Sequence, residues 1–112
     1  MIDWSRVTEL RDEIGSEDFA EVVALFLEEA DEVVARLPAC DGARPLESAL
    51  HFLKGSALNL GFDQLAALCQ DGERQAGAGS VSVGTAAIAA CYAASKSEFE
   101  RGLDRLGDTG AA

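Results

Sequence analysis

The sequence predicts an all-α fold, an antiparallel four-helix bundle with a short additional N-terminal helix. Apolar residues recur at spacings of three and four along the 112-residue chain, which is the period of amphipathic helices. The alternation of β-branched and polar residues that would indicate strands is nearly absent. Long amphipathic helices with short connections pack as antiparallel bundles. We expect one domain, residues 1–112, because a chain of this length can bury a single core without metals or disulfides.

Two helices are expected in the N-terminal third of the chain. The first spans Asp3–Ile14 and ends at Gly15. Ser16 is a suitable N-cap for the second helix, and the acidic residues that follow it favour the positive end of the helix dipole. The apolar period of the second helix continues for about five turns to Leu37, and Pro38 stops it.

The third helix is expected at about residues 45–60, with Pro45 at its first position and Gly61 as its C-terminal stop. A fourth helix follows Asp63 and carries Gly72 in its interior. The stretch GAGSVSVG, residues 77–84, is the clearest loop in the sequence. The last helix runs from about residue 85 to 106, and the tail GDTGAA, residues 107–112, is expected to be disordered.

The charge balance excludes several classes of partner. Twenty acidic and nine basic residues give a formal charge of −11. Nucleic acids need basic surface to neutralise their phosphates, and anionic membranes attract basic segments. No apolar run approaches the roughly 20 residues that span a bilayer, and the N-terminus does not resemble a signal peptide. We therefore expect a cytoplasmic protein, a monomer, that binds neither nucleic acid nor membrane.

The chain shows no motif for a cofactor of its own. Neither G-x-x-x-x-G-K-[ST] nor G-x-G-x-x-G is present, so the sequence offers no means of binding ATP or a dinucleotide. Cys40, Cys69 and Cys91 have no C-x-x-C spacing. With a single histidine they make a zinc site improbable, and we expect them to be buried reduced thiols. No metal site is predicted.

The only histidine in the chain, His51, lies in the stretch HFLKGSALNLG. Residues three and four apart share a helix face, so His51 groups with Glu47, Lys54, Gly55 and Leu58. The apolar stripe of this helix lies beside that face, and His51 should be at least partly exposed. A neutral imidazole is a capable nucleophile near neutral pH.

Gly55 is unexpected in a helix interior, where glycine costs about 1 kcal/mol relative to alanine. The absence of a Cβ allows another backbone or a bulky group to approach the imidazole one turn away. Lys54 adds a cation within reach of a group attached to that imidazole. The triplet therefore suggests a phosphoryl group on His51, although a surface histidine without function and a glycine for close helix packing are equally compatible with the pattern.

The stretch from His51 to Gly61 closely resembles the H-x-L-K-G-S-[SA]-x-x-L-G signature of histidine-containing phosphotransfer (HPt) domains. The following FDQLAALCQDGE resembles the next helix of that family. The resemblance implies a four-helix-bundle phosphoprotein of a two-component phosphorelay. Such a protein exchanges a phosphoryl group with the aspartate of receiver domains or takes it from a sensor histidine kinase. It is not an enzyme in its own right, because the receiver supplies Mg²⁺.

The resemblance also implies roles for individual residues. His51 matches the phosphoacceptor, which in the family reacts through Nε2. Lys54 matches the residue that stabilises the phosphoryl charge, and Gly55 the small residue that gives the partner clearance. In the family, a Gln or Glu from the next helix hydrogen-bonds the ring. Glu73 fits that place best and Gln70 is its rival.

Other features near His51 are less determined by the resemblance. Glu47 could hold the ring from within the same helix. Leu58 and Phe62 are candidates for a partner-binding apolar patch, although both could simply pack at the end of the bundle. Two alternative functions stay open: a helical adaptor without phosphate chemistry, and the phosphoacceptor domain of a sensor kinase. Kinase domains of that kind usually have an acidic residue after the histidine, where this chain has Phe52.

Overall fold

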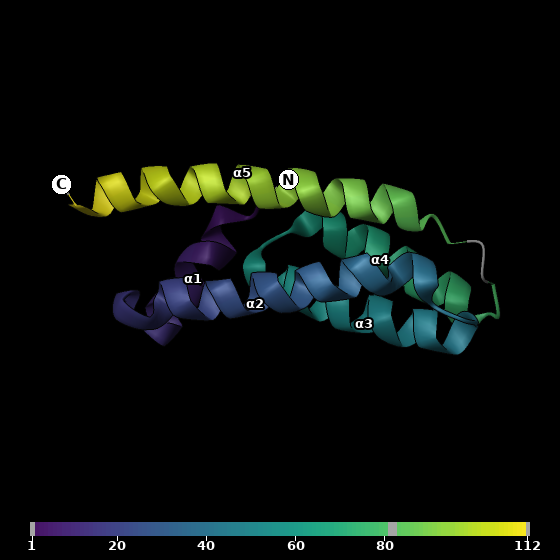
Figure 1. Ribbon diagram of the computed structural model, residues 1–112. Helices are drawn as coiled ribbons and strands as arrows, with labels where there is room; N and C mark the ends of the chain where they lie inside the picture. The colour runs from purple at the N-terminus through teal and green to yellow at the C-terminus, as the bar shows by residue number, and fades with distance from the viewer. Residues whose placement is uncertain (1, 81–82, 112) are drawn as a thin grey trace.

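The computed structural model describes residues 2–80 and 83–111. Within these residues the protein is built from five α-helices and one 3₁₀ turn (Figure 1). The helices and the turn are α1 (Trp4–Ile14), α2 (Ser16–Arg36), η1 (Leu37–Ala39), α3 (Ala43–Leu60), α4 (Asp63–Gly77) and α5 (Thr85–Ala111). The all-α prediction is confirmed.

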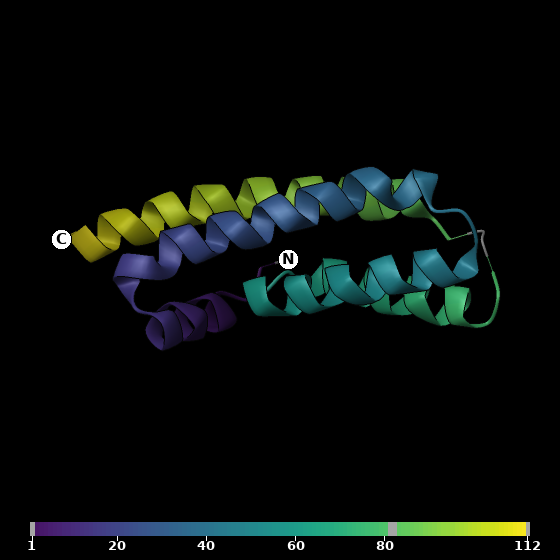
Figure 2. The same ribbon diagram turned by 60° about the horizontal axis from the view of Figure 1, so that its bottom comes forward.

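Helices α2 to α5 form the bundle, and α1 lies at one end of it. Figure 2 shows α2 beside α5 in one layer and α3 beside α4 in the other. Contacts are most extensive between α3 and α4, and further contacts join α2 to α3, α4 to α5 and α2 to α5. Successive bundle helices run in opposite directions (Figures 1 and 2). The short α1 packs against α2 and α3.

Helix α1 is attached to the corner where α3 ends. The Asp3 side chain caps α1 by accepting hydrogen bonds from the backbone amides of Ser5 and Arg6. The Asp3 amide donates to the carbonyl of Gly61 at 2.7 Å. Gly61 has φ +77°, and a Cβ there would lie 2.6 Å from the Asp3 carbonyl oxygen. Glycine is therefore required at this corner by both the backbone conformation and the close approach of α1.

The core is one apolar cluster between the helices. Phe99 of α5 is fully buried. Its ring stacks on Trp4 with centroids 5.9 Å apart and meets Phe62 edge-on at 5.2 Å. At the surface, Asp31 of α2 accepts a hydrogen bond from the Tyr92 hydroxyl and pairs with Lys96 of α5. These polar contacts of Asp31 join α2 to α5 at the edge of the core.

Two helix boundaries differ from the sequence-based expectation. Helix α3 begins at Ala43, so Pro45 is its third residue. Its missing N–H costs nothing there, because the first four amides of a helix have no intrahelical partner. Helix α5 continues to Ala111, past the end expected near residue 106. Glycine weakens a helix by about 1 kcal/mol but does not interrupt its hydrogen bonds, so α5 can continue through the glycines near its end. The expected disorder of the tail, residues 107–112, stays a prediction.

The cysteines are all free thiols. Only Cys69 is fully buried, and burial raises the pKa of its thiol to about 12. Cys40 and Cys91 are partly exposed, so the expectation of buried thiols holds for one of the three. No helix in the described part of the chain is long and apolar enough to cross a membrane.

Candidate functional site

His51 projects from the middle of α3 on the side of α4. Its side chain is 69% exposed, because the buried stripe of α3 passes through the neighbouring positions Leu50 and Leu53. Nδ1 of the ring lies 2.7 Å from Oε1 of Glu73 on α4. Nε2 forms no hydrogen bond with any residue that the structure describes. One ring nitrogen is therefore held and the other is free to react.

Glu73 connects the histidine to Lys54. Its second oxygen, Oε2, lies 2.8 Å from Nζ of Lys54. Both side chains are largely enclosed, with 20% of Glu73 and 24% of Lys54 exposed. The Lys54 ammonium, with a smaller effect from the His51 ring, holds the pKa of Glu73 below its usual value near 4.5, against the opposing effect of burial. Glu73 is thus an ionised carboxylate at neutral pH.

The other two candidates for contact with the ring do not reach it. Gln70 is exposed and makes no side-chain hydrogen bond with the described part of the chain. Glu47 turns toward the end of α4, where its Oε2 lies 2.7 Å from the place a Cβ of Gly77 would occupy. The geometry therefore selects Glu73 as the residue that contacts the ring.

Gly72 explains how Glu73 comes to face His51. Gly72 is buried in α4, and a Cβ there would lie 3.0 Å from Cδ1 of Leu50 and 2.9 Å from Cγ1 of Val83. The missing side chain lets α3 approach α4 closely at this level. A glycine inside a helix weakens it, and a bend at Gly72 would displace Glu73. Instead α4 continues as one helix to Gly77, and the glycine brings Glu73 within reach of the ring.

Gly55 has a different environment. Apart from its two chain neighbours and its own helix backbone, no atom in the described part of the chain lies within 4 Å of the position that a Cβ would occupy. Close packing among the described residues therefore does not explain the glycine. It leaves space on the open side of α3, one turn from His51.

The two residues predicted to bind a partner, Leu58 and Phe62, differ in solvent exposure. Leu58 is 55% exposed and lies two turns after His51 on α3. Phe62 is fully buried and packs against Tyr92 and Phe99. The expectation that Phe62 lies at the surface is therefore wrong, because aromatic residues of α5, distant in sequence, enclose it.

Phe52 and Leu25 are further exposed apolar residues that were not identified from the sequence. Phe52, next to His51, is 43% exposed, and Leu25 of α2 is 55% exposed. Phe52 could have been found, since it lies off the apolar stripe of its helix. The same signal applies to Leu25, which lies off the buried stripe of α2 that runs through Val23 and Leu27.

The arrangement is suited to a nucleophilic histidine. An ionised carboxylate can only accept hydrogen bonds, so with a neutral ring the proton lies on Nδ1 and points to Glu73. The lone pair is then on Nε2, which faces outward, and the contact with Glu73 fixes both the tautomer and the orientation of the ring. No group of three or more His, Cys, Asp or Glu side chains in the described ranges could hold a metal ion.

Comparison with protein-family models matches residues 21–109 to the Hpt domain. The match covers most of α2, all of α3 and α4, and nearly all of α5. It includes every residue of the site described above. Comparisons with curated proteins and with solved structures found no match.

Proposed function

The chain belongs to the Hpt domain family, whose members act in phosphotransfer of two-component signalling, and from this premise we propose that His51 carries the phosphoryl group. The group comes from, or passes to, the aspartate of response-regulator receiver domains, and a sensor histidine kinase supplies it to the pathway. The observation that carries the proposal is the contact between His51 Nδ1 and Glu73 Oε1 at 2.7 Å beneath an exposed ring.

The proposed reaction uses the free ring nitrogen. Nε2 of His51 attacks the phosphorus of an aspartyl phosphate on the receiver. A P–N bond forms as the P–O bond to the aspartate breaks, and the aspartate leaves as a carboxylate. Nδ1–H keeps its hydrogen bond to Glu73, which stabilises the positive charge that develops on the ring. The reverse step regenerates the neutral histidine, so the chain can pass the group in either direction.

Lys54 has two tasks in this proposal. In the unphosphorylated structure its ammonium pairs with Glu73, which keeps that carboxylate ionised and in place. An ammonium has three donors, so Lys54 can keep this contact and also interact with a phosphoryl oxygen. The charge stabilisation expected from the family resemblance is thus compatible with the pairing, but it requires a small movement of the lysine side chain toward Nε2.

The chain is proposed to be a phosphorelay intermediate and not an enzyme. It contributes the nucleophile and a rigid platform, whereas the receiver contributes Mg²⁺ and the acidic residues that bind it. Gly55 supports this division, because the space above it is open to a partner. We also propose that the protein acts in the cytoplasm as a monomer, consistent with its composition. Its mass in solution tests the second statement.

Phosphorylation by receivers tests the proposal directly. The wild-type protein is incubated with a panel of phosphorylated receiver domains and with a sensor kinase plus ATP. We expect an acid-labile, base-stable phosphate that is absent from His51→Gln. Because the chain has one histidine, this chemical stability locates the phosphate. No labelling under conditions that label a known HPt domain contradicts the proposal and favours a helical adaptor.

A further inference from the structure

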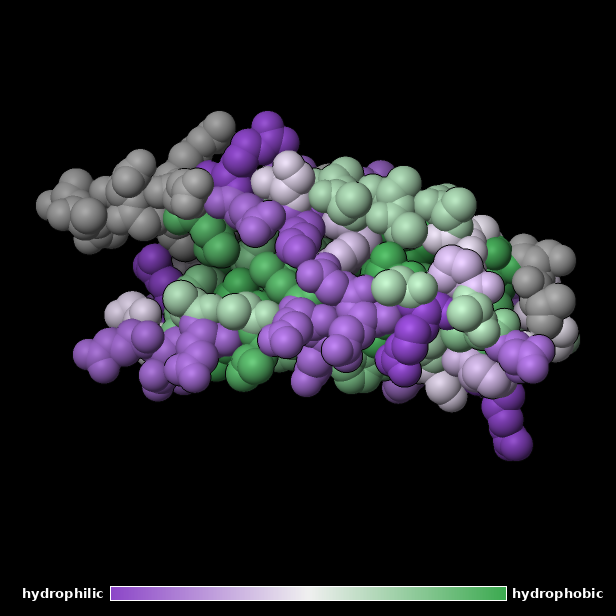
Figure 3. Space-filling view, in the orientation of Figure 1, coloured by the Kyte–Doolittle hydropathy of each residue, from purple (hydrophilic) through white to green (hydrophobic). Residues whose placement is uncertain are grey.

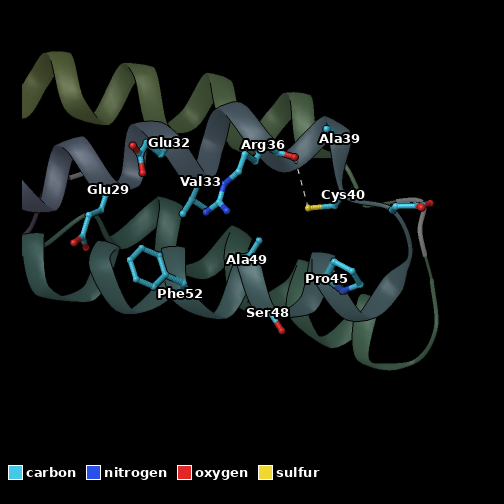
Figure 4. Close-up of a pocket in the computed structure, with 11 residues that line it drawn as sticks. Glu29, Glu32, Val33, Arg36, Ala39, Cys40, Pro45, Ser48, Ala49 and Phe52 are labelled. Carbon is cyan, nitrogen blue, oxygen red and sulfur yellow. Dashed lines mark hydrogen bonds between the residues drawn. The ribbon is translucent and has the colours of Figure 1, made fainter.

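A groove runs between the second half of α2 and the first half of α3. Its volume is about 780 Å³, and Figure 4 shows the residues that line it. The Phe52 ring lies at one end, next to the phosphoacceptor in sequence, and the groove extends from there toward the connection between α2 and α3. Val33 and Ala49 contribute apolar surface from the two helices. Ser48 also lines the groove and shares a helix face with His51, three residues later, so this partly apolar site borders the face that carries His51.

Charged side chains border this apolar surface. Glu29 and Glu32 are exposed residues on the α2 side, near the Phe52 end (Figure 4). Neither carboxylate forms an ion pair or a hydrogen bond with any residue that the structure describes. Arg36 reaches into the groove from the next turn and is likewise without an ionic partner in the described part of the chain. Hydrophilic residues gather along α2 on the face shown in Figure 3.

We propose that this groove binds an amphipathic segment of the receiver partner that presents a large aliphatic side chain flanked by Lys or Arg. The aliphatic side chain packs between Val33, Ala49 and Phe52, and the basic residues pair with Glu29 and Glu32. The proposal rests on the proposed function, since the segment belongs to the protein that exchanges phosphate with His51. It adds the chemistry by which this chain distinguishes one receiver from another.

Charge complementarity supports a basic segment as the occupant. The two unpaired carboxylates lie within one turn of each other on α2, in a chain of net charge −11. A basic segment is attracted by this surface during diffusion, and an acidic one is repelled. Buried apolar contact then slows dissociation, because removal of apolar area from water is worth about 25 cal/mol per Å². Binding in the groove would also orient the partner beside His51, since Ser48, which lines the groove, lies one turn before His51 on the same helix face.

Two variants test the groove without touching the phosphoacceptor. Glu29→Lys/Glu32→Lys reverses the charge of the border, and Ala49→Trp fills the apolar part. Glu21→Lys/Glu28→Lys makes the same charge change at exposed positions of α2 outside the groove, and Ala67→Trp adds the same side chain at an exposed position of α4. The first variant changes only exposed residues, so it retains the fold even where Ala49→Trp does not. Circular dichroism shows whether each variant retains the helical fold.

Each variant is phosphorylated first with phosphoramidate, a small donor that needs no docking, and then with the receiver that best exchanges phosphate with the wild type. We expect unchanged labelling by phosphoramidate. With the receiver, kcat/KM should fall by about tenfold or more in the groove variants, mainly through KM, and by less than about twofold in the controls.

A compensating change in the receiver, Lys or Arg to Glu in its docking segment, should restore transfer to Glu29→Lys/Glu32→Lys. The inference is overturned if the groove variants exchange phosphate with the receiver as fast as their controls. That result would leave the proposed function of phosphoryl transfer through His51 intact, because the receiver would still exchange phosphate with the protein. If no receiver transfers phosphate to the wild type while phosphoramidate labels it, the proposed function fails together with this inference.

Discussion

Gly55 of α3 and Gly72 of α4 are both interior helix glycines, and they have opposite surroundings. A Cβ on Gly72 would press against Leu50 and Val83 at 3.0 and 2.9 Å. A Cβ on Gly55 would have no neighbour within 4 Å among the described residues, apart from its chain neighbours and its own helix backbone. Each glycine costs its helix about 1 kcal/mol relative to alanine. Gly72 allows close helix packing in return, whereas no packing contact with the described residues requires Gly55.

The difference separates the two sides of the site. The side toward α4 is closed, and its packing determines where Glu73 meets the His51 ring. The solvent-facing side of α3, which carries Gly55, Leu58 and Phe52, is open. A residue that destabilises its own helix without an internal reason indicates selection for something outside the chain. In our account, the closed side prepares the ring and the open side receives the partner.

The largest effect on stability is expected for Gly72→Leu. The added side chain overpacks the contact between α3 and α4, which should lower the free energy of unfolding by about 1–3 kcal/mol. Urea denaturation followed by circular dichroism measures it. Gly55→Leu is the matched control, since the same side chain there meets open space, and it should lose little stability. If Gly72→Leu and Gly55→Leu were destabilised equally, the claim that only Gly72 is closely packed would be wrong.

Removal of the Glu73 carboxylate should have a large effect on transfer and a small one on stability. Glu73→Ala leaves Nδ1 without its acceptor and should slow phosphoryl transfer by about tenfold or more. Glu73→Gln retains an acceptor oxygen without the charge and should give an intermediate rate. Gln70→Ala, one turn earlier on α4, is the control and should transfer normally. A slow Gln70→Ala with a normal Glu73→Ala would reverse the assignment of the ring contact.

The nitrogen chemical shifts of the His51 ring give a second test of Glu73. In the wild type the neutral ring should be protonated at Nδ1. In Glu73→Ala the spectrum should shift toward the tautomer protonated at Nε2. A merely structural contribution of Glu73 would leave the tautomer unchanged.

The smallest expected effect is a shift in the titration of Glu73. Lys54 lowers the pKa of this carboxyl, so Lys54→Met should raise it. The carboxylate's contribution to stability is present above its usual value near 4.5 and is lost as pH falls through the lowered pKa of the folded protein. In Lys54→Met this contribution should be smaller, because the folded and unfolded pKa values of Glu73 lie closer together. Carbon NMR of the Glu73 carboxyl measures the shift; an unchanged titration would exclude Lys54 as its cause.

Most of the fold follows from local patterns in the sequence. Amphipathic periods and terminal glycines predicted all five helices in order, and the motif around His51 identified the exposed face. The family resemblance favoured Glu73 over Gln70, but local patterns alone do not decide between them. The choice depends on how α4 is rotated against α3, where Gly72 packs against Leu50. Phe62 was misplaced for a similar reason. Its burial depends on Phe99 and Tyr92, which are more than 25 residues away in sequence.

Substitution of Gly55 tests the central claim most directly, because stability and transfer should change in opposite directions. Gly55→Ala should raise the free energy of unfolding by up to about 1 kcal/mol, and Gly55→Gln should leave the fold intact. Labelling by phosphoramidate should be retained in both variants. Transfer from a receiver should be slowed, more by glutamine than by alanine. If Gly55→Gln exchanges phosphate with its receiver at the wild-type rate, the open side of α3 is not the surface on which the partner docks.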